Sequence, residues 1–269
     1  ILTHKNYKFT SMTHTQHGLY PLTSPQREIW FDQMLHEGIP LYNIGGYVKI
    51  PGAIDPALFE QAVNLLVQKH DTLRTLLTEV ADEDGVPMQT YAESVAVTVL
   101  VRDFSGEADP HQAAMAWMQQ RFIEQFELTK RPLFRYDLLK IREDYYYWLL
   151  QYHHLIIDGS GVALLNRSLA EIYTHKANGQ VPNLDSFSYV NFIENDRAYV
   201  ESAVFDKQRQ YWLDKYPTPP EPLLSPRYRS NYTNKLIGSG IEVLYLPREF
   251  YNRLNKLAKQ HNADRKSVV

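Results

Sequence analysis

The sequence contains no cysteine among its 269 residues. This absence excludes disulfide bonds, thiolate metal sites and a cysteine nucleophile. Long apolar runs are also missing: no run of apolar residues approaches the roughly 20 that a membrane-spanning helix needs. The first residues lack the layout of a secretory signal peptide, so the cytoplasm is the expected location.

The charge shows no large excess of one sign, since 28 Lys and Arg residues face 31 Asp and Glu residues and the formal net charge is −3. This balance argues against a nucleic-acid partner and against an anionic membrane surface. The hydrophobic content of 44% and the charged content of 22% are those of an ordinary globular chain. A chain of this length can form one large domain or two small lobes, with ample material for a core.

Two familiar catalytic loops are absent as well. Gly45 and Gly46 are adjacent but lack the other residues of a phosphate-binding loop, which favours close packing of a strand instead. Ser160 lies in the run 158–161, which does not match the G-x-S-x-G turn of serine hydrolases. The sequence therefore favours neither of these two enzyme classes.

The most distinctive stretch is residues 152–161, which read Tyr-His-His-Leu-Ile-Ile-Asp-Gly-Ser-Gly. The aromatic and aliphatic run before it, residues 145–151, predicts a buried strand. Apolar residues at helical spacing from Val162 to Tyr173 predict a helix after it. Two histidines and an aspartate therefore fall in a tight turn between a core strand and a helix, which indicates a site.

His153 and His154 are predicted to have different roles, because neighbouring residues at a strand end point to opposite faces. One imidazole is expected to be held inside by hydrogen bonds, while the other faces a cavity and accepts a proton from a nucleophile. Asp158 is placed to shape the turn, by bonding to the backbone or by pairing with an arginine. Gly159 allows the backbone to approach a substrate, and the first N–H groups of the helix favour developing negative charge. A metal site is the weaker interpretation, because adjacent histidines converge poorly on one ion.

This stretch resembles the signature of the condensation domains of nonribosomal peptide synthetases, and three further segments agree with that family in order and spacing. Residues 22–30 resemble the first family motif, with Pro25 where alanine is usual. Residues 69–76 resemble the second motif. Residues 189–192 resemble the fourth more loosely, with Asn191 in place of the usual aspartate. Four motifs in order are far more specific than any one of them.

The resemblance implies an α+β fold like that of chloramphenicol acetyltransferase, a two-layer α/β sandwich with its first lobe complete and its second lobe partial. It implies amide-bond formation between a donor acyl or peptidyl thioester and the amine of an acceptor aminoacyl thioester. Both substrates would be tethered to phosphopantetheine arms of upstream and downstream peptidyl carrier proteins, next to an adenylation domain of the same larger chain. The resemblance implies a monomeric domain with no directly bound cofactor.

The same resemblance assigns roles to the residues of the turn. His154 would accept the proton of the attacking amine or orient that amine, and the Gly159 N–H would stabilise the oxyanion. Asp158 would hold the turn, and His153 would be structural. Arg74 lies in the second motif, which makes it the expected structural partner of Asp158.

Two alternatives remain open. A stand-alone acyltransferase that uses coenzyme A is one, because H-x-x-x-D-G alone is common to the superfamily, and a non-catalytic domain that recruits carrier proteins is the other. Heterocyclising relatives usually replace the histidines by aspartate, and epimerising relatives often carry a tryptophan where Val162 and Ala163 stand, so neither subtype is favoured. A first, or starter, module is the expected setting.

Three segments are expected along the chain. Residues 1–21 read as a leader or tag-like segment, residues 22–180 as the lobe that holds the site, and residues 181–269 as a connecting helix, a proline-rich linker and the start of a second lobe. Both ends are expected to be cut, with Met12 as a candidate native start, and the fragment is expected to be inactive alone.

The hydrophobic pattern and the capping residues predict the individual elements. Helices are predicted from Ser24 towards Leu35, from Asp55 through Leu66, from Asp109 through Phe126, from the site turn to Asn178, from Tyr189 to Tyr216, and from Arg248 to Gln260. Strands are predicted at Ile44–Ile50, Leu73–Val80, Met88–Tyr91, Val95–Val101, Leu133–Ile141, Tyr145–Tyr152 and Ile241–Leu246.

Overall fold

The computed structural model of the protein describes residues 9–13, 18–129, 131–221 and 244–264. The chain divides into two compact units, Ile1–Ser225 and Pro226–Val269. The first unit contains the sheets and the candidate site, and the described part of the second contains the helix α7 (Arg248–Gln260). The α7 bounds match the helix predicted from the sequence.

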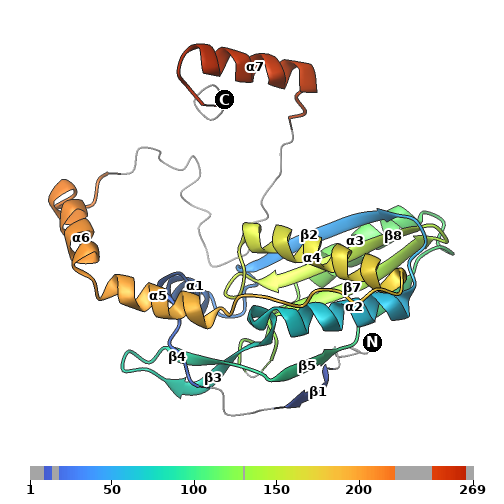
Figure 1. The fold of residues 1–269 in the computed structure, drawn as a ribbon, viewed down its shortest axis with the longest axis horizontal. Coiled ribbons are helices and arrows are strands. Elements are labelled where there is room, and N and C mark those ends of the chain that lie inside the picture. Colours follow the sequence, from blue (N-terminus) through green and yellow to red (C-terminus); the bar gives the residue numbers. More distant parts are fainter. Residues whose placement is uncertain (1–8, 14–17, 130, 222–243, 265–269) are drawn as a thin grey trace. The chain divides into compact units, whose positions relative to one another are not determined.

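A four-stranded sheet forms the centre of the first unit (Figure 1). Its strands, in spatial order, are β2 (Asn43–Pro51), β8 (Tyr145–His153), β7 (Phe134–Arg142) and β6 (Leu100–Asp103). β8 is antiparallel to both of its neighbours, whereas β6 runs parallel to β7. The predicted hairpin of core strands is confirmed as β7 and β8.

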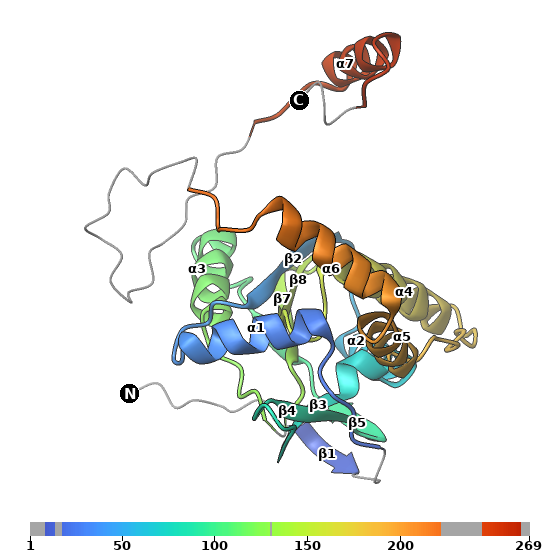
Figure 2. The same ribbon diagram turned by 90° about the vertical axis from the view of Figure 1, so that its left-hand side faces the viewer.

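Helices cover both faces of this sheet, as Figure 2 shows. On one face, α2 (Pro56–Lys69) and α4 (Gly159–Ala177) pack against even-numbered residues of β8 such as Trp148 and Tyr152. On the other face, α3 (Pro110–Phe122) packs against Tyr147 and Leu149. Because side chains alternate along a strand, β8 is buried on both sides, and this explains its nearly continuous aromatic and aliphatic sequence. The α+β class expected from the sequence is confirmed.

Two small sheets extend the unit beyond α2. β3 (Thr75–Ala81) pairs with β4 (Pro87–Tyr91), and β1 (Phe9–Thr13) pairs with β5 (Ser94–Val97), both antiparallel. The single strand predicted for residues 95–101 is therefore wrong, because β5 and β6 belong to different sheets. Two polar side chains of α2 bind the backbone between β5 and β6. Asn64 bonds to the N–H and the carbonyl of Val97, and Glu60 accepts from Val99 N at 2.9 Å.

The long helix predicted for residues 189–216 is two helices, α5 (Val190–Val200) and α6 (Ala203–Lys215). Ser202 separates them, since its extended backbone ends the first helix and its side chain accepts from Phe205 N to cap the second. Aromatic and charged residues are mixed throughout this region, so the hydrophobic periodicity does not show where the first helix ends and the second begins. In the predicted strand 241–246, residues 241–243 lie outside the described residues, and residues 244–246 are not in a strand.

Among the residues that the structure describes, no helix has the length and apolarity that a membrane crossing demands.

Candidate functional site

The candidate site is the turn between β8 and α4, and its backbone is fixed on both sides of the two histidines. His153 N donates to Leu133 O at 2.9 Å, and His154 N donates to Tyr42 O at 2.8 Å. The turn then runs to Asp158, and α4 begins at Gly159. Hydrogen bonds to two different segments therefore hold the strand end in place before the helix begins.

His153 is the inward-facing histidine. Its side chain is only 2% exposed, and its Nδ1 accepts from Leu155 N at 3.2 Å. Because Nδ1 acts as the acceptor, Nε2 carries the proton and faces Gln33 Oε1 at 3.4 Å. Burial, with a smaller effect from His154, lowers the pKa of His153 to about 4. His153 is therefore a neutral, internally bonded imidazole near neutral pH.

This burial predicts a pH-dependent stability. The native pKa of His153, about 4, lies below its ordinary value of 6.5, so the unfolded chain binds the proton more tightly. The stabilising contribution is complete above pH 6.5 and is lost as the pH falls towards 4, and its full size is about 3 kcal/mol. Asp137 works in the opposite direction, because burial raises its pKa to about 6 despite the Arg121 charge.

The test is urea unfolding of the wild type and of His153→Gln at pH 7 and at pH 4.5. The comparison cancels the contribution of Asp137, which both proteins share. We expect the stability advantage of the wild type at pH 7 to shrink by about 2 kcal/mol or more at the lower pH. An advantage that stays constant over this range would show that His153 does not titrate between the two pH values.

His154 occupies different surroundings, as the strand-end argument expected. It is half-buried rather than buried, and its ring meets the ring of Tyr42 nearly edge-on, with centroids 6.4 Å apart and an interplanar angle of 77°. Its backbone is bonded to Tyr42, whereas its imidazole lies outside the core. Of the two adjacent imidazoles, His154 is therefore the one with access to an external reactant.

Asp158 caps α4 and does not pair with Arg74. Its carboxylate accepts from Gly161 N at 2.7 Å, and the residue is exposed. Arg74 instead donates to the backbone carbonyls of Val67, Ala92 and Glu93. Within the described part of the chain no ion pair joins Asp158 to Arg74, so that sequence-based assignment is wrong. The first amides of α4 attract the carboxylate, and three backbone carbonyls from other segments attract the guanidinium.

The capping geometry sets the expected effect of removing Asp158. Asp158→Ala should lower the free energy of unfolding by about 1 kcal/mol, the usual cost of losing an N-cap side chain. Asp158→Asn, which keeps an acceptor oxygen, should lower it by only a few tenths. Chemical denaturation of both variants checks this, and a loss of roughly 3–5 kcal/mol in the alanine variant would instead indicate a buried ion pair.

The two glycines of the turn differ in what surrounds them. A Cβ added to Gly159 would meet no atom within 4 Å, whereas one added to Gly161 would lie 2.6 Å from Ile157 Cγ1. Gly159 thus leaves an open space at the start of α4, and within the described residues no group accepts from its N–H. Gly161 is required for packing, a role that sequence reasoning did not assign.

Hydrogen bonds connect the four sequence motifs around this turn. From the first motif, Gln26 Nε2 donates to Leu155 O at 3.1 Å. From the second, Thr72 Oγ1 donates to Ile156 O at 2.6 Å. Asp71, also in the second motif, accepts from Tyr189 N at 2.8 Å and so connects it to the fourth. Segments that are far apart in the sequence therefore hold consecutive carbonyls of one turn.

Gln89 completes this support and was missed by the sequence analysis. It is fully buried and exchanges side-chain amide hydrogen bonds with Gln26 at 2.8 and 3.1 Å. It also donates to Pro21 O at 2.9 Å. The sequence around Gln89 does not indicate that it is buried, because its partners Gln26 and Pro21 lie 63 and 68 residues away.

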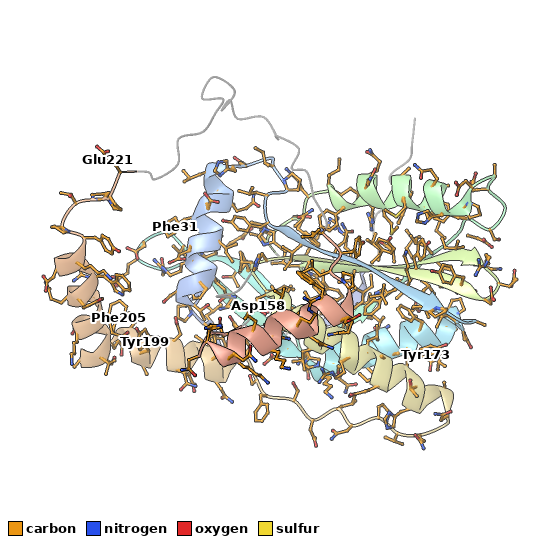
Figure 3. The ribbon with its side chains drawn as sticks, turned by 90° about the horizontal axis from the view of Figure 1, so that it is seen from above. Phe31, Asp158, Tyr173, Tyr199, Phe205 and Glu221 are labelled. Carbon is orange, nitrogen blue, oxygen red and sulfur yellow. The ribbon has the colours of Figure 1, made fainter. Side chains whose placement is uncertain are left out.

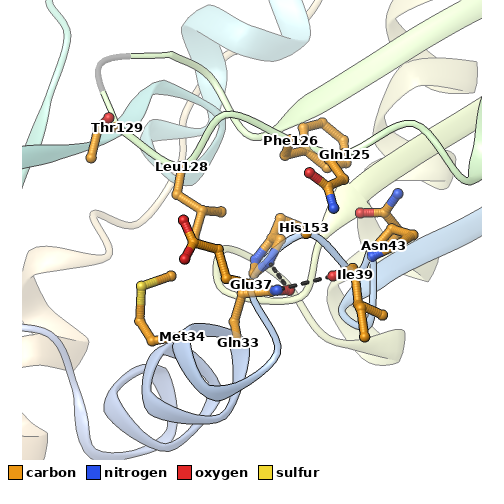
Figure 4. Close-up of a pocket in the computed structure, with 12 residues that line it drawn as sticks. Gln33, Met34, Glu37, Ile39, Asn43, Gln125, Phe126, Leu128, Thr129 and His153 are labelled. Carbon is orange, nitrogen blue, oxygen red and sulfur yellow. Dashed lines mark hydrogen bonds between the residues drawn. The ribbon is translucent and has the colours of Figure 1, made fainter. Parts of the chain in front are cut away.

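A cavity of about 240 Å³ opens on the His153 side of the turn (Figure 4). His153 lines this cavity and His154 does not, which differs from the expectation that the histidine outside the core would face the cavity. It lies between the end of α1 (Ser24–Leu35), the loop 37–40 and the loop 125–129. Gln33 stands between the cavity and the core, because its side chain faces His153 and donates to Ile39 O. No group of three or more His, Asp or Glu side chains that could hold a metal ion occurs in the described residues.

The motifs and the turn match one protein family. The model of the Condensation domain family matches residues 16–269. The chain belongs to this family.

Related proteins and solved structures agree. The isonitrile lipopeptide synthase of Streptomyces coeruleorubidus is 35% identical over 211 residues, and the dimodular nonribosomal peptide synthase of Bacillus subtilis (strain 168) is 32% identical over 249 residues. The starter condensation domain of rhizomide synthetase matches 76% of this chain with a TM-score of 0.69 and 35% identity. The first condensation domain of the CDA synthetase matches 93% with a TM-score of 0.76 and 25% identity. These matches confirm the expected chloramphenicol acetyltransferase-like α/β fold.

The chain spans only part of each of these relatives. The matches to the two synthases cover 78% and 92% of this chain but only 14% and 10% of the synthases, so both synthases are much larger proteins. It covers 49% of the solved starter domain and 59% of the CDA condensation domain. This chain, which contains the site turn, therefore spans about half of a solved condensation domain.

Proposed function

We propose that this condensation domain segment carries the catalytic turn of an enzyme that forms amide bonds between two carrier-bound substrates. The donor is an acyl or peptidyl thioester, and the acceptor is the amine of an aminoacyl thioester. The amine nitrogen attacks the thioester carbon, the C–N bond forms, the C–S bond breaks, and the thiol leaves with a proton. The observation that supports this most is His154, an accessible imidazole on a fixed backbone beside the open N-terminus of α4.

Each residue of the turn has a proposed role in that reaction. His154 accepts the proton that the amine loses, or orients the amine for attack. The Gly159 N–H has no acceptor among the described residues and lies at a helix N-terminus, where a partial positive charge favours the oxyanion of the tetrahedral intermediate. Asp158 fixes the first turn of α4, and the neutral His153 fixes the end of β8 from inside. Holding two tethered reactants together supplies much of the remaining rate enhancement.

The proposed partners follow from this chemistry. Upstream and downstream peptidyl carrier proteins deliver the substrates on phosphopantetheine arms, an adenylation domain lies nearby in the same larger chain, and the domain binds no cofactor of its own. A starter module is the proposed setting. It is supported by the 35% identity to the rhizomide starter domain, a variant of which has been crystallised with C8-CoA. A fatty acyl donor would also fit the relationship to a lipopeptide synthase.

Residues 22–180 are the proposed acetyltransferase-like lobe, and residues 181–269 the proposed connection to a second lobe. We further propose that residues 1–269 alone do not catalyse amide-bond formation, since this chain covers about half of a solved condensation domain. A coenzyme A-dependent acyltransferase is the second candidate function. The complex of the rhizomide relative with C8-CoA is the observation that favours it.

The experiment compares donors and acceptors in the multidomain protein that contains this chain. Acyl-loaded carrier and free acyl-coenzyme A are each offered with aminoacyl-loaded carrier and with free amine, and the products are measured by mass spectrometry. We expect amide on the acceptor carrier only when both substrates are carrier-bound. Equal rates with free acyl-coenzyme A and free amine would favour the stand-alone acyltransferase, and carrier binding without product would favour the recruiting domain.

A further inference from the structure

Tyr42 lies against both histidines of the turn and belongs to none of the four motifs. It immediately precedes β2, and its carbonyl accepts from His154 N at 2.8 Å. Its ring centroid lies 6.1 Å from that of His153 and 6.4 Å from that of His154. The backbone and the side chain of one residue therefore contact the same part of the site.

The far end of the Tyr42 ring is anchored on α1. Its hydroxyl donates to Asp32 Oδ2 at 2.7 Å, and this bond raises the pKa of Tyr42, so the phenol stays protonated and donating. The titratable neighbours of this pair are Glu28, whose charge also raises the pKa of Tyr42, and His36, whose Nδ1 lies 3.5 Å from Asp32 Oδ1. The ring is thus held at one end by the chain before β2 and at the other by a carboxylate.

We propose that Tyr42 is a positioning residue for His154, held in its working orientation by Asp32. The reason lies in what the backbone leaves undetermined. The bond from His154 N to Tyr42 O fixes the Cα of His154 but not the rotation of its imidazole. An aromatic edge packed against that imidazole favours one orientation, and the Asp32 bond keeps the aromatic ring itself from rotating away. The kinetic part of this inference rests on the proposed amide-forming function.

Four substitutions distinguish the effect of the hydrogen bond between Tyr42 and Asp32 from the effect of the Tyr42 ring itself. Tyr42→Phe and Asp32→Ala each remove the hydrogen bond but keep the ring at position 42. Asp32→Asn keeps an acceptor oxygen for the tyrosine hydroxyl, and Tyr42→Leu removes the ring altogether. Tyr173→Phe is the matched control, because it also removes a bonded tyrosine hydroxyl, here the acceptor for Asp55 N at 3.1 Å. Tyr173 and Asp158 lie at opposite ends of α4 (Figure 3).

In the multidomain protein we expect Tyr42→Phe and Asp32→Ala each to lower kcat about tenfold, with little change in KM, because a misaligned base slows the chemical step. The double variant should be no slower than either single variant, since both remove the same bond. Asp32→Asn and Tyr173→Phe should retain the wild-type kcat. Equal losses in kcat and in melting temperature for all variants, or a slow Asp32→Asn, would overturn the positioning role.

A spectroscopic readout separates this inference from the proposed function. The full 269-residue chain is labelled on its histidine rings, and the His154 signal is assigned from its absence in His154→Ala. We expect the imidazole signal of His154 to move in Tyr42→Leu and in Asp32→Ala, and to stay in place in Asp32→Asn and Tyr173→Phe. Unmoved signals in the first pair would refute the positioning role. Moved signals in the chain, together with no amide product from the wild-type multidomain protein, would refute the proposed reaction and leave the positioning role standing.

Discussion

His154→Ala in the multidomain protein should lower the rate of amide formation by roughly two to four orders of magnitude, the usual effect of removing a general base. The fold should be unaffected, because His154 is half-buried and its bond to the rest of the site runs through its backbone N–H, which alanine retains. Single-turnover rates with both carriers loaded, together with the melting temperature, check the two halves of this expectation.

His175→Ala is the matched control for His154→Ala. His175 lies in the last turn of α4, the helix that follows the site, and is exposed. In the described residues its side chain bonds only to Glu171 O. We expect it to keep the wild-type rate. A His154→Ala protein that forms amide at a near-normal rate would remove His154 from the reaction, whatever the control does.

Gly45→Ala should unfold the first unit or severely destabilise it. Gly45 lies in β2 opposite Gln151, with a φ of +146°, and an added Cβ would lie 2.1 Å from Leu150 O. That oxygen belongs to the backbone of the central strand and cannot move aside without breaking the sheet. Backbone strain and overpacking each cost about 1–3 kcal/mol, and here both apply.

The next residue supplies the control. Gly46 lies in the same strand, yet an added Cβ there would meet no atom within 4 Å. Gly46→Ala should therefore change the free energy of unfolding by less than about 1 kcal/mol. Denaturation curves of the two variants measure the difference directly, and similar values for both would show that β2 does not approach β8 as closely as the structure places it.

The sequence predicts the central part of this fold well because the physical signal there is local. The strand at residues 145–153 carries a nearly continuous aromatic and aliphatic run, and a strand buried on both faces has that composition. Asp55 and Pro56 mark the start of α2 because a cap and a first-turn proline act within a few residues. The contrast between His153 and His154 follows in the same way from the alternation of side chains at a strand end.

Most of the predictions that failed depend on contacts between distant segments, whereas the division of the helix predicted for residues 189–216 comes from the local Ser202 cap. Residues 95–101 look like one strand, and only Glu60 and Asn64 on α2 determine that the chain turns between two sheets. The resemblance predicts a pair between Arg74 and Asp158, but the backbone carbonyls that bind the Arg74 guanidinium lie 7, 18 and 19 residues from it in the sequence, and no motif marks them. The burial of Gln89 is equally invisible, because it depends on a second glutamine that lies 63 residues away.

The central claim is that the two adjacent histidines have different roles: His153 stabilises the turn, and His154 accepts the proton of the amine or orients the amine. The most direct test is to measure amide formation and the melting temperature on the same preparations of wild type, His153→Gln and His154→Ala in the multidomain protein. The account predicts that His154→Ala loses the rate at an unchanged melting temperature, and that His153→Gln loses melting temperature while its folded fraction keeps measurable turnover. A stable, inactive His153→Gln protein beside an active His154→Ala protein would contradict it.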